Sequence, residues 1–253
     1  MTGPRGDGRK PGSLRSVRLI RSCLRQASGS ALIRAGNTQV LCAATIEDKA
    51  PSFLRGTGRG WVTAEYGMLP ASVSERAPRN KISGRGMEIQ RLIGRSLRSV
   101  VDLSKLGERQ ITIDCDVLEA DGGTRTAAVT AAWVALREAI DRMLRERVLP
   151  EDPILDSVAA ISVGRVGGAL LLDLCQAEDT RAEVDFNVVA TGSGRLVEVQ
   201  GTAEHGSFSR RELQQMVSSG LAGIRRLTRL QQRCVTSAPK PLGVLLVGRP
   251  EGT

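Results

Sequence analysis

The sequence is poor in the residue types on which many active sites and binding surfaces depend. Its 253 residues include one histidine, His205, and six aromatic side chains. A metal site built from two histidines of one chain is therefore excluded, and acid–base catalysis by histidine rests on a single candidate. A surface that stacks several nucleotide bases on aromatic rings would also be poorly supplied.

Paired cysteines and long apolar runs are missing as well. The five cysteines are scattered and form no C-x-x-C pair, which argues against a disulfide scaffold or a zinc cluster and fits a reducing cytoplasm. No apolar run approaches the roughly 20 residues that cross a bilayer, so we expect no membrane partner. Residues 1–16 are polar and basic, with no apolar segment behind them, and predict a flexible arm rather than a secretory signal.

Positive charge, by contrast, is abundant. The net charge is +9, the isoelectric point is near 10.0, and 31 of the 36 basic residues are arginine while 5 are lysine. Such a balance is typical of proteins that bind a polyanion such as nucleic acid, because the planar guanidinium grips phosphate in a bidentate manner. A genome rich in G and C would raise the arginine content without any such function. Both explanations stay open at this point.

Hydrophobic periodicity and turn residues divide the chain into strand-forming and helix-forming segments. Strands are expected over 17–46 as a meander, over 109–120, over 157–175 as a hairpin around Gly167-Gly168, and over 183–191 paired with 196–202. Helices are expected over 88–101, over 124–145 and from 210 to about 232, the last with Ser209 as N-cap and Glu212 at N3. Residues 47–86, rich in glycine and arginine, are expected to form an irregular loop. Side chains expected in the core include Met68, Met87 and Trp133.

Strands are followed by helices twice, over about 17–145 and about 157–232. This order predicts an α+β fold of two similar halves packed together, within one domain that spans residues 1–235. The remainder, 236–253, contains three prolines and three glycines. We expect it to be a flexible tail.

The segment Asp121-Gly-Gly-Thr-Arg-Thr126 carries the most chemical information. Two glycines at the end of a strand allow a close backbone turn, and a helix begins directly after them. Backbone N–H groups, the positive end of the helix dipole, threonine hydroxyls and the guanidinium of Arg125 would meet at one place, as an anion requires. The alternative is an ordinary strand-to-helix turn with Thr124 as N-cap.

Two single residues near the expected elements are weaker candidates. Arg85 lies between two glycines just ahead of the first long helix, where it would either bind the same anion or remain a solvated loop residue. His205 follows the last expected strand, a place where a histidine is more often structural or exposed than catalytic.

Acidic residues gather in one short stretch of this basic chain. Five of them lie within 13 residues, namely Asp173, Glu178, Asp179, Glu183 and Asp185. Carboxylate oxygens suit Mg²⁺ or Mn²⁺, which take one or two carboxylates and keep several waters. The alternative is a solvated loop. Asp114 and Asp116 share one face of the strand expected over 109–120 and form a second candidate pair.

Several long motifs, in order and at matching spacing, resemble the ribonuclease PH family of phosphorolytic exoribonucleases. They are WVTAEYGMLP (61–70), MEIQRLIGRSLR (87–98), ITIDCDVLEADGGTRTAA (111–128), AEDTRAEVDFNVVAT (177–191) and VEVQGTAE (197–204). The resemblance implies a ribonuclease PH-like fold of two βαβα-type halves and a homohexamer built as a trimer of dimers. It also implies trimming of the 3′ ends of tRNA precursors, in which RNA(n+1) and phosphate give RNA(n) and a nucleoside diphosphate, with Mg²⁺ or Mn²⁺ as cofactor.

The same resemblance assigns roles to individual residues. The phosphate-binding arginine of the family falls on Arg85, and its phosphate loop on Gly123, Thr124 and Arg125. Its two catalytic, metal-associated aspartates fall on Asp179 and Asp185. Its RNA-binding arginines match Arg59, Arg76 and Arg79. Residues 71–84 are shorter than is usual in the family, and Ala71 stands where the family often has arginine.

The residues and the resemblance agree on mechanism. Inorganic phosphate is already an anionic nucleophile at neutral pH, so phosphorolysis needs charge neutralisation and alignment more than a general base. Three alternatives are a catalytically silent RNA-binding ring subunit of an exosome-like assembly, a metal-dependent hydrolytic nuclease, and a basic RNA-binding module. The first disagrees with the intact Arg125, Asp179 and Asp185, and dependence on phosphate would exclude the second.

Overall fold

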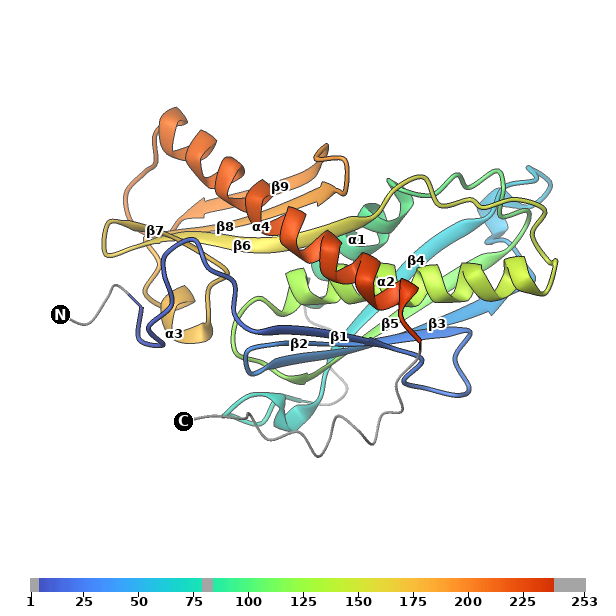
Figure 1. Ribbon diagram of the computed structural model, residues 1–253, viewed down its shortest axis with the longest axis horizontal. Helices are drawn as coiled ribbons and strands as arrows, with labels where there is room; N and C mark the ends of the chain where they lie inside the picture. The colour runs from blue at the N-terminus through green and yellow to red at the C-terminus, as the bar shows by residue number, and fades with distance from the viewer. Residues whose placement is uncertain (1–4, 79–83, 239–253) are drawn as a thin grey trace.

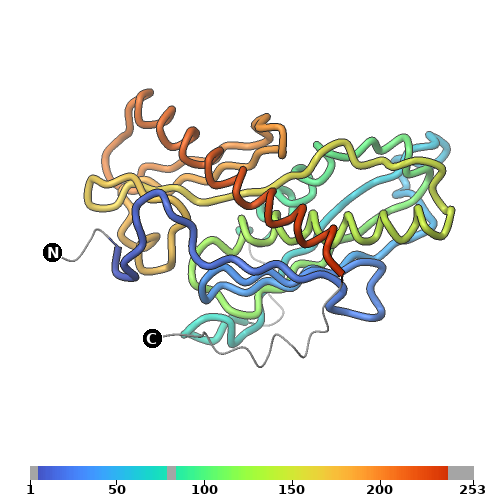
Figure 2. Tube along the Cα trace, in the orientation of Figure 1, coloured from blue at the N-terminus to red at the C-terminus, as the bar shows by residue number. Residues whose placement is uncertain are grey.

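The computed structural model describes residues 5–78 and 84–238. It contains two β-sheets that lie side by side, with helices packed on and between them (Figures 1 and 2). The first sheet has the order β1-β2-β3-β5-β4 and the second has the order β7-β6-β8-β9. The predicted α+β fold is therefore confirmed.

The first sheet is antiparallel except at one pair. Its strands are β1 (Val17–Arg21), β2 (Gly29–Ala35), β3 (Thr38–Glu47), β4 (Trp61–Met68) and β5 (Gln110–Glu119). The parallel pair β4 and β5 is joined through helix α1 (Gly84–Arg98), and helix α2 (Thr124–Arg145) follows β5. Alternate residues of β5, such as Ile111 and Ile113, are fully buried in the core that these helices share with the sheet. Asp114 and Asp116 lie on the other face of β5, outside this core.

Strand β4 corrects the expectation of an irregular loop over residues 47–86. Only its flanks are irregular or 3₁₀-helical, with η1 at Ser52–Leu54 and η2 at Pro70–Ser72. Val62 and Ala64 alternate with more exposed neighbours and are buried, which is the strand period that the surrounding glycines obscured. Helix α1 begins at residue 84 rather than 88. Met87 on its first turn is 47% exposed, so its expected place in the core was wrong.

Neighbouring strands of the second sheet all run antiparallel to each other. Its elements are β6 (Val158–Val166), β7 (Ala169–Leu172), the short helix α3 (Gln176–Asp179), β8 (Val184–Thr191), β9 (Leu196–Ala203) and helix α4 (Arg210–Thr236). The hairpin at Gly167-Gly168 is confirmed, and both glycines have positive φ. The capping box of Ser209 and Glu212 is confirmed as well. Helix α4 extends one turn beyond the expected end, and of the expected tail, residues 239–253 lie outside the described part of the chain.

Helix α2 joins the two sheets. It is buried along most of its length, with Trp133 only 3% exposed. Its many small side chains let it pack closely on β2 and β3 of the first sheet and on β6 of the second. The N-terminus of α2 consequently lies at the seam between the halves. Among the described residues, no helix combines the length and the hydropathy that crossing a bilayer requires.

The N-terminal segment differs most from its prediction. Residues 5–16 were expected to be a flexible arm, yet Arg5 is 2% and Arg15 is 7% exposed. Arg5 donates to both carboxylate oxygens of Glu178 at 2.7 Å. An arginine is buried this fully only when carboxylates and carbonyls satisfy its donors. The carboxylate partners of Arg5 and Arg15, Glu178 and Asp173, are more than 150 residues away in sequence, so local composition gave no sign of them.

Candidate active site

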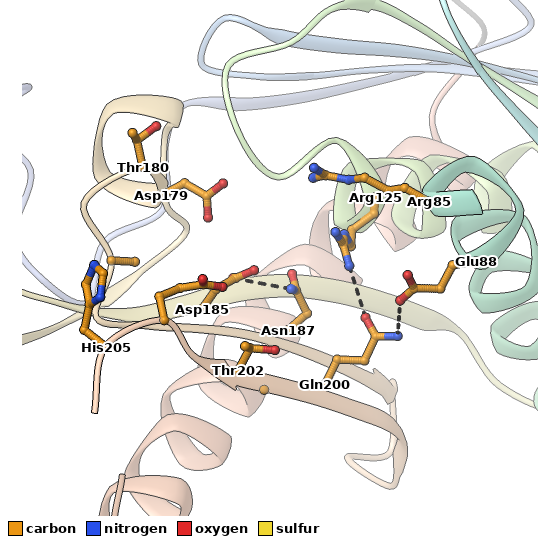
Figure 3. Close-up of a pocket in the computed structure, with 13 residues that line it drawn as sticks. Arg85, Glu88, Arg125, Asp179, Thr180, Asp185, Asn187, Gln200, Thr202 and His205 are labelled. Atoms are coloured by element: carbon orange, nitrogen blue, oxygen red, sulfur yellow. Dashed lines mark hydrogen bonds between the residues drawn. The ribbon is translucent and has the colours of Figure 1, made fainter. Parts of the chain in front are cut away.

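A cleft of about 850 Å³ opens at the seam between the two halves (Figure 3). The first half contributes Arg85, Glu88 and Arg125, from the first turns of α1 and α2. The second half contributes side chains from α3, β8, β9 and the loop after β9, namely Asp179, Thr180, Asp185, Asn187, Gln200, Thr202, Glu204 and His205. Both arginines of the cleft therefore lie on one wall, together with Glu88, and the facing wall carries carboxylates and amides among its polar groups.

The turn that precedes α2 is built from glycines for a steric reason. Gly122 and Gly123 have φ of +74° and +66°, a region in which side chains are disfavoured. A Cβ at Gly122 would also lie 2.7 Å from the carbonyl carbon of Cys175. The turn therefore packs its backbone directly against the segment that leads into α3.

The first turn of α2 is open to an anion. Gly123 is the N-cap, and within the described residues no side chain caps this terminus. The expected alternative, Thr124 as N-cap, was wrong: its hydroxyl instead accepts a hydrogen bond from Tyr66 at 2.8 Å. The backbone N–H groups at the positive end of this long helix therefore line the same cavity as the side chains of Arg85 and Arg125.

Gln200 connects Arg125 with the other half of the molecule. Its amide oxygen accepts from Arg125 Nη1 at 3.2 Å, and its amide nitrogen donates to Glu88 at 3.2 Å and to Glu198 at 3.0 Å. Figure 3 shows the line from Arg125 through Gln200 to Glu88. Glu198 in turn forms a bidentate ion pair with Arg95 of α1. These contacts fix the orientation of Arg125 across the seam.

Asp179 ends α3 and Asp185 lies in β8, and both line the cleft. Burial raises the pKa of Asp179, while the positive charges of Arg85 and Arg125 offset part of the rise. Burial also raises the pKa of Asp185, the negative charge of Asp179 adds to the rise, and both arginines oppose it. The two carboxyl groups are therefore close enough to interact with each other and with both arginines.

The other three acids of the predicted cluster have separate partners. Asp173 and Glu178 are bound by arginines of the N-terminal segment, and Glu183 pairs with Arg165. The structure thus reduces the cluster of five to two residues that face the cleft. Asp114 and Asp116 lie on the outward face of β5 and do not line this cleft.

The aspartate pair fits a hard divalent cation. Among the described residues, no three histidine, cysteine or acidic side chains group together as a metal site would require. Mg²⁺ does not need such a cage, since it binds through one or two carboxylates and completes its shell with waters and substrate phosphates. Burial raises the pKa of both carboxyl groups, and the charge of Asp179 raises that of Asp185 further, so this pair is a donor set that such a cation would stabilise.

A second cavity of about 480 Å³ adjoins the cleft. It contains Gly123 and Thr124 and has an apolar wall that includes Ile89. The residues shared by both cavities are Arg85, Arg125, Asp179, Asp185 and Asn187. The arginines and aspartates thus lie where the two spaces meet, with the helix terminus on one side and the polar cleft on the other.

Of the predicted RNA-binding arginines, neither Arg59 nor Arg76 lines this cleft. Arg76 is exposed and precedes Ala77, which lines the second cavity. Arg59 is exposed and precedes β4, at the end of that strand remote from the site. Because a strand of this length spans roughly 25 Å, Arg59 lies far from the cleft. Arg79 lies outside the described residues.

Several polar residues of the cleft were not singled out from the sequence, among them Asn187, Gln200 and Glu204, and all three fall within motifs that carried the resemblance. Asn187 follows Asp185 by two positions in β8, and Gln200 precedes Thr202 by two in β9. Polar residues two positions apart share one face of a strand. This spacing is the sequence signal from which Asn187 and Gln200 could have been predicted. Glu204, the third, lies just beyond β9.

Comparison with known proteins agrees with this geometry. Residues 13–140 match the model of the 3′ exoribonuclease family, domain 1, and residues 156–223 match domain 2 of the same family. The chain is 54% identical over 235 residues to a protein named Ribonuclease PH from Solibacter usitatus (strain Ellin6076), covering 91% of this chain and 99% of that protein.

Solved structures show the same fold. An Archaeoglobus fulgidus exosome with RNA bound to the active site superposes with a TM-score of 0.77 at 23% identity, over 89% of this chain and 91% of that chain. Rice (Oryza sativa) Rrp46 superposes with a TM-score of 0.75 at 21% identity, over 92% of this chain and all of the other. The predicted ribonuclease PH-like fold is confirmed. The chain belongs to the 3′ exoribonuclease family and, within it, to the phosphate-dependent ribonuclease PH enzymes.

Proposed function

We propose that this cleft removes nucleotides from the 3′ ends of tRNA precursors by phosphorolysis, with the residues named below in the stated roles. The observation that carries the proposal is the meeting of two cavities at Arg85, Arg125, Asp179 and Asp185. Phosphate would occupy the side with the helix terminus, and the RNA end would occupy the polar cleft. Nucleophile and scissile phosphodiester would then approach each other at the shared residues.

The cationic wall binds and aligns phosphate. Arg85 and Arg125 supply charge and guanidinium donors, and the turn at Gly123 and Thr124 supplies backbone N–H groups. These groups lower the repulsion between an anionic nucleophile and an anionic substrate. They also stabilise the charge that develops on the transferring phosphorus.

The acidic wall serves the other side of the reaction. Asp179 and Asp185 would hold Mg²⁺ or Mn²⁺, and when bound such an ion neutralises charge on the phosphodiester oxygens. An oxygen of phosphate forms a bond to the terminal phosphorus, the bond from that phosphorus to the preceding 3′ oxygen breaks, and this oxygen gains a proton. The products are a nucleoside diphosphate and an RNA shorter by one nucleotide. Either aspartate, its pKa raised by burial, can act as the proton donor.

The assembly and the RNA path form part of the same proposal. We place the chain in the cytoplasm as a homohexamer, a trimer of dimers, in which loops from several subunits pool their arginines around the substrate. Arg76 and Arg79 would bind RNA as well. Arg59, remote from the cleft of its own subunit, would contact RNA bound elsewhere in the ring.

The test is a product analysis. A tRNA precursor is incubated with Mg²⁺, with and without phosphate, and the released nucleotides are separated. The proposal predicts nucleoside diphosphates that appear only with phosphate. Nucleoside monophosphates in the absence of phosphate would instead indicate a hydrolytic nuclease, and RNA binding without any release would indicate a silent ring subunit.

A further inference from the structure

The N-terminal strap, residues 5–15, is fastened along its length to the second half of the molecule. Two elements of the second half donate hydrogen bonds to its middle. Arg226 of α4 donates to the carbonyl of Gly12 at 2.8 Å, and the backbone N–H of Leu172 in β7 donates to the carbonyl of Pro11 at 2.9 Å. Arg5 and Arg15, at the two ends, are buried. These arginines contact the two segments that carry the phosphate loop and the aspartates.

Arg15 bridges these two segments directly. On one side its Nη2 and Nε donate to Asp173 Oδ1 at 2.7 and 3.2 Å, and its backbone N–H donates to Asp173 Oδ2 at 2.7 Å. On the other side its Nη1 donates to the carbonyl of Asp121 at 2.7 Å and, at 3.3 Å, to that of Gly122. A single buried guanidinium thus joins the turn before α3 to the turn before α2.

The two turns also touch each other where Arg15 spans them. The backbone N–H of Gln176, the first residue of α3, donates to Asp121 Oδ1 at 3.1 Å. Gly122 has no room for a side chain against Cys175. Asp173 holds a left-handed φ of +59°, which a non-glycine residue adopts when its surroundings fix it there. Here Arg15 binds both oxygens of its carboxylate.

Arg5 contacts the same turn before α3 and also the helix that follows it. It forms a bidentate ion pair with Glu178, the residue directly before Asp179, and it donates to the carbonyls of Leu172 and Asp173 at 2.8 and 2.9 Å. Burial raises the pKa of Glu178, but the hydrogen bonds from Arg5 and from the backbone of Cys175, together with the charges of Arg5 and Arg9, outweigh it, and the pKa of Glu178 lies below its ordinary value. The pair is therefore ionised in the neutral range.

We propose that Arg15 is a positioning residue that sets the separation between the phosphate loop at Gly123–Arg125 and the aspartate turn that ends at Asp179. The proposal rests on the proposed function, since it assigns phosphate to one of these segments and the RNA end to the other. Arg15 touches neither substrate. It acts by fixing two backbone segments whose mutual distance decides whether the reacting atoms meet in line.

The decisive variant is Arg15→Lys, which keeps a positive charge beside Asp173 but loses the fork that reaches both turns. Because a misplacement of about 1 Å can cost about 100-fold in rate, we expect kcat to fall by roughly 10- to 100-fold, with KM for phosphate raised as well. RNA affinity without phosphate should stay within about twofold, since exposed arginines hold the backbone. In Arg15→Ala, added ethylguanidinium should restore part of the lost rate.

The matched control is Arg226→Ala, which removes an outer fastening of the same strap and touches neither turn. It should leave kcat and both KM values unchanged. Hydrogen exchange, measured without substrates, should show faster exchange of the amides of residues 121–124 and 173–179 in Arg15→Lys but not in Arg226→Ala. This comparison is independent of turnover.

The outcomes are separable. If folded Arg15→Lys kept the wild-type kcat, KM for phosphate and exchange rates, the positioning role would be wrong. Equal effects of Arg15→Lys and Arg226→Ala would reduce the strap to a general stabiliser and overturn it too. If the wild-type protein released no nucleoside diphosphate, the proposed function would fail, while the exchange comparison would still decide the role of Arg15.

Discussion

The two halves of the molecule present opposite chemistry to the cleft that they share. In the first half, the β4–α1–β5–α2 order starts two long helices at the seam, and each carries an arginine on its first turn. In the second half, the site residues come from strands, from a helix of four residues and from the loop after β9, and they include the acids Asp179 and Asp185 and the amides Asn187 and Gln200. Similar architecture thus places helix N-termini on one side, where the proposed function puts the phosphate anion, and carboxylates on the other, where it puts the cation.

Within the second half, the acidic residues also differ in their surroundings: some are paired with arginines and others face the cleft. Asp173 and Glu178 are paired with buried arginines, so they serve the structure. Asp179 and Asp185 face the cleft with raised pKa values. A cluster that looks uniform in sequence is therefore divided into members paired with arginines, most of them in the N-terminal strap, and members that face the cleft.

The largest effect is expected from removing an acid of the cleft. Asp185→Asn or Asp179→Asn should lower turnover by about 100-fold or more, because the charge that would hold the cation or the proton that the leaving oxygen needs is lost. RNA affinity should be retained or increased, since a negative charge near the RNA is removed. Single-turnover rates and RNA titrations measure both quantities, and a variant with near wild-type turnover at limiting metal would remove that residue from the site.

A smaller effect is expected on the cationic wall. Arg125→Lys keeps the charge but cannot form two parallel hydrogen bonds to phosphate. A hydrogen bond to a charged group contributes about 1.5–3 kcal/mol, so catalytic efficiency toward phosphate should fall by roughly 10- to 100-fold. Initial rates against phosphate concentration provide the measurement. An unchanged phosphate response combined with lost RNA affinity would make Arg125 an RNA-binding residue instead.

A still smaller change in phosphate kinetics is expected from removing the hydrogen bond between Gln200 and Arg125, which connects the two walls. Gln200→Leu removes the amide that orients Arg125 and bridges to Glu88. Because one hydrogen bond contributes about 0.5–1.5 kcal/mol, KM for phosphate should rise by about 3- to 10-fold while kcat changes less. Thr202→Val, in the same strand and on the same cleft wall, serves as control. Equal shifts in both variants would show that the amide has no particular role.

The smallest effect concerns stability and has a definite sign. The pKa of Asp185 is raised in the folded protein, so ionising this carboxyl at neutral pH weakens the fold, and the cost vanishes once pH falls below the ordinary aspartate pKa of about 3.9. In the presence of a chelator, Asp185→Asn should therefore stabilise the protein at pH 7 and lose this gain near pH 4. Urea unfolding at both pH values tests this expectation, and a neutral or destabilising effect at pH 7 would contradict it.

Sequence reasoning located the elements whose signals are local. Helix α2 was predicted with the bounds that it has, because a Gly-Gly turn precedes a long apolar run and the helix ends in arginines. The acidic cluster and the Gly123–Arg125 turn were likewise visible, since each lies within a few residues of sequence. Strand β4 was missed because the glycines and arginines around it outweighed the alternation of its own eight residues.

What the sequence did not reveal depends on tertiary pairing. A basic segment such as residues 5–15 is usually solvated, and only the fold brings Arg5 to Glu178 and Arg15 to Asp173. For the same reason, the sequence did not show which acids of the cluster remain available in the cleft. The role of Gln200 needed both halves in place, since its partners lie on α1, α2 and its own strand.

The central claim is that the first half binds phosphate and the second half binds the cation. Ligand binding without RNA tests it most directly. Phosphate binding is followed by calorimetry and Mn²⁺ binding by electron paramagnetic resonance, each in wild type, Arg125→Ala and Asp185→Asn. The account predicts a crossed result: Arg125→Ala loses most of its phosphate affinity and keeps Mn²⁺, whereas Asp185→Asn loses Mn²⁺ and keeps phosphate. The reverse pattern, or loss of both ligands in folded single variants, would contradict a site in which one half binds the anion and the other binds the cation.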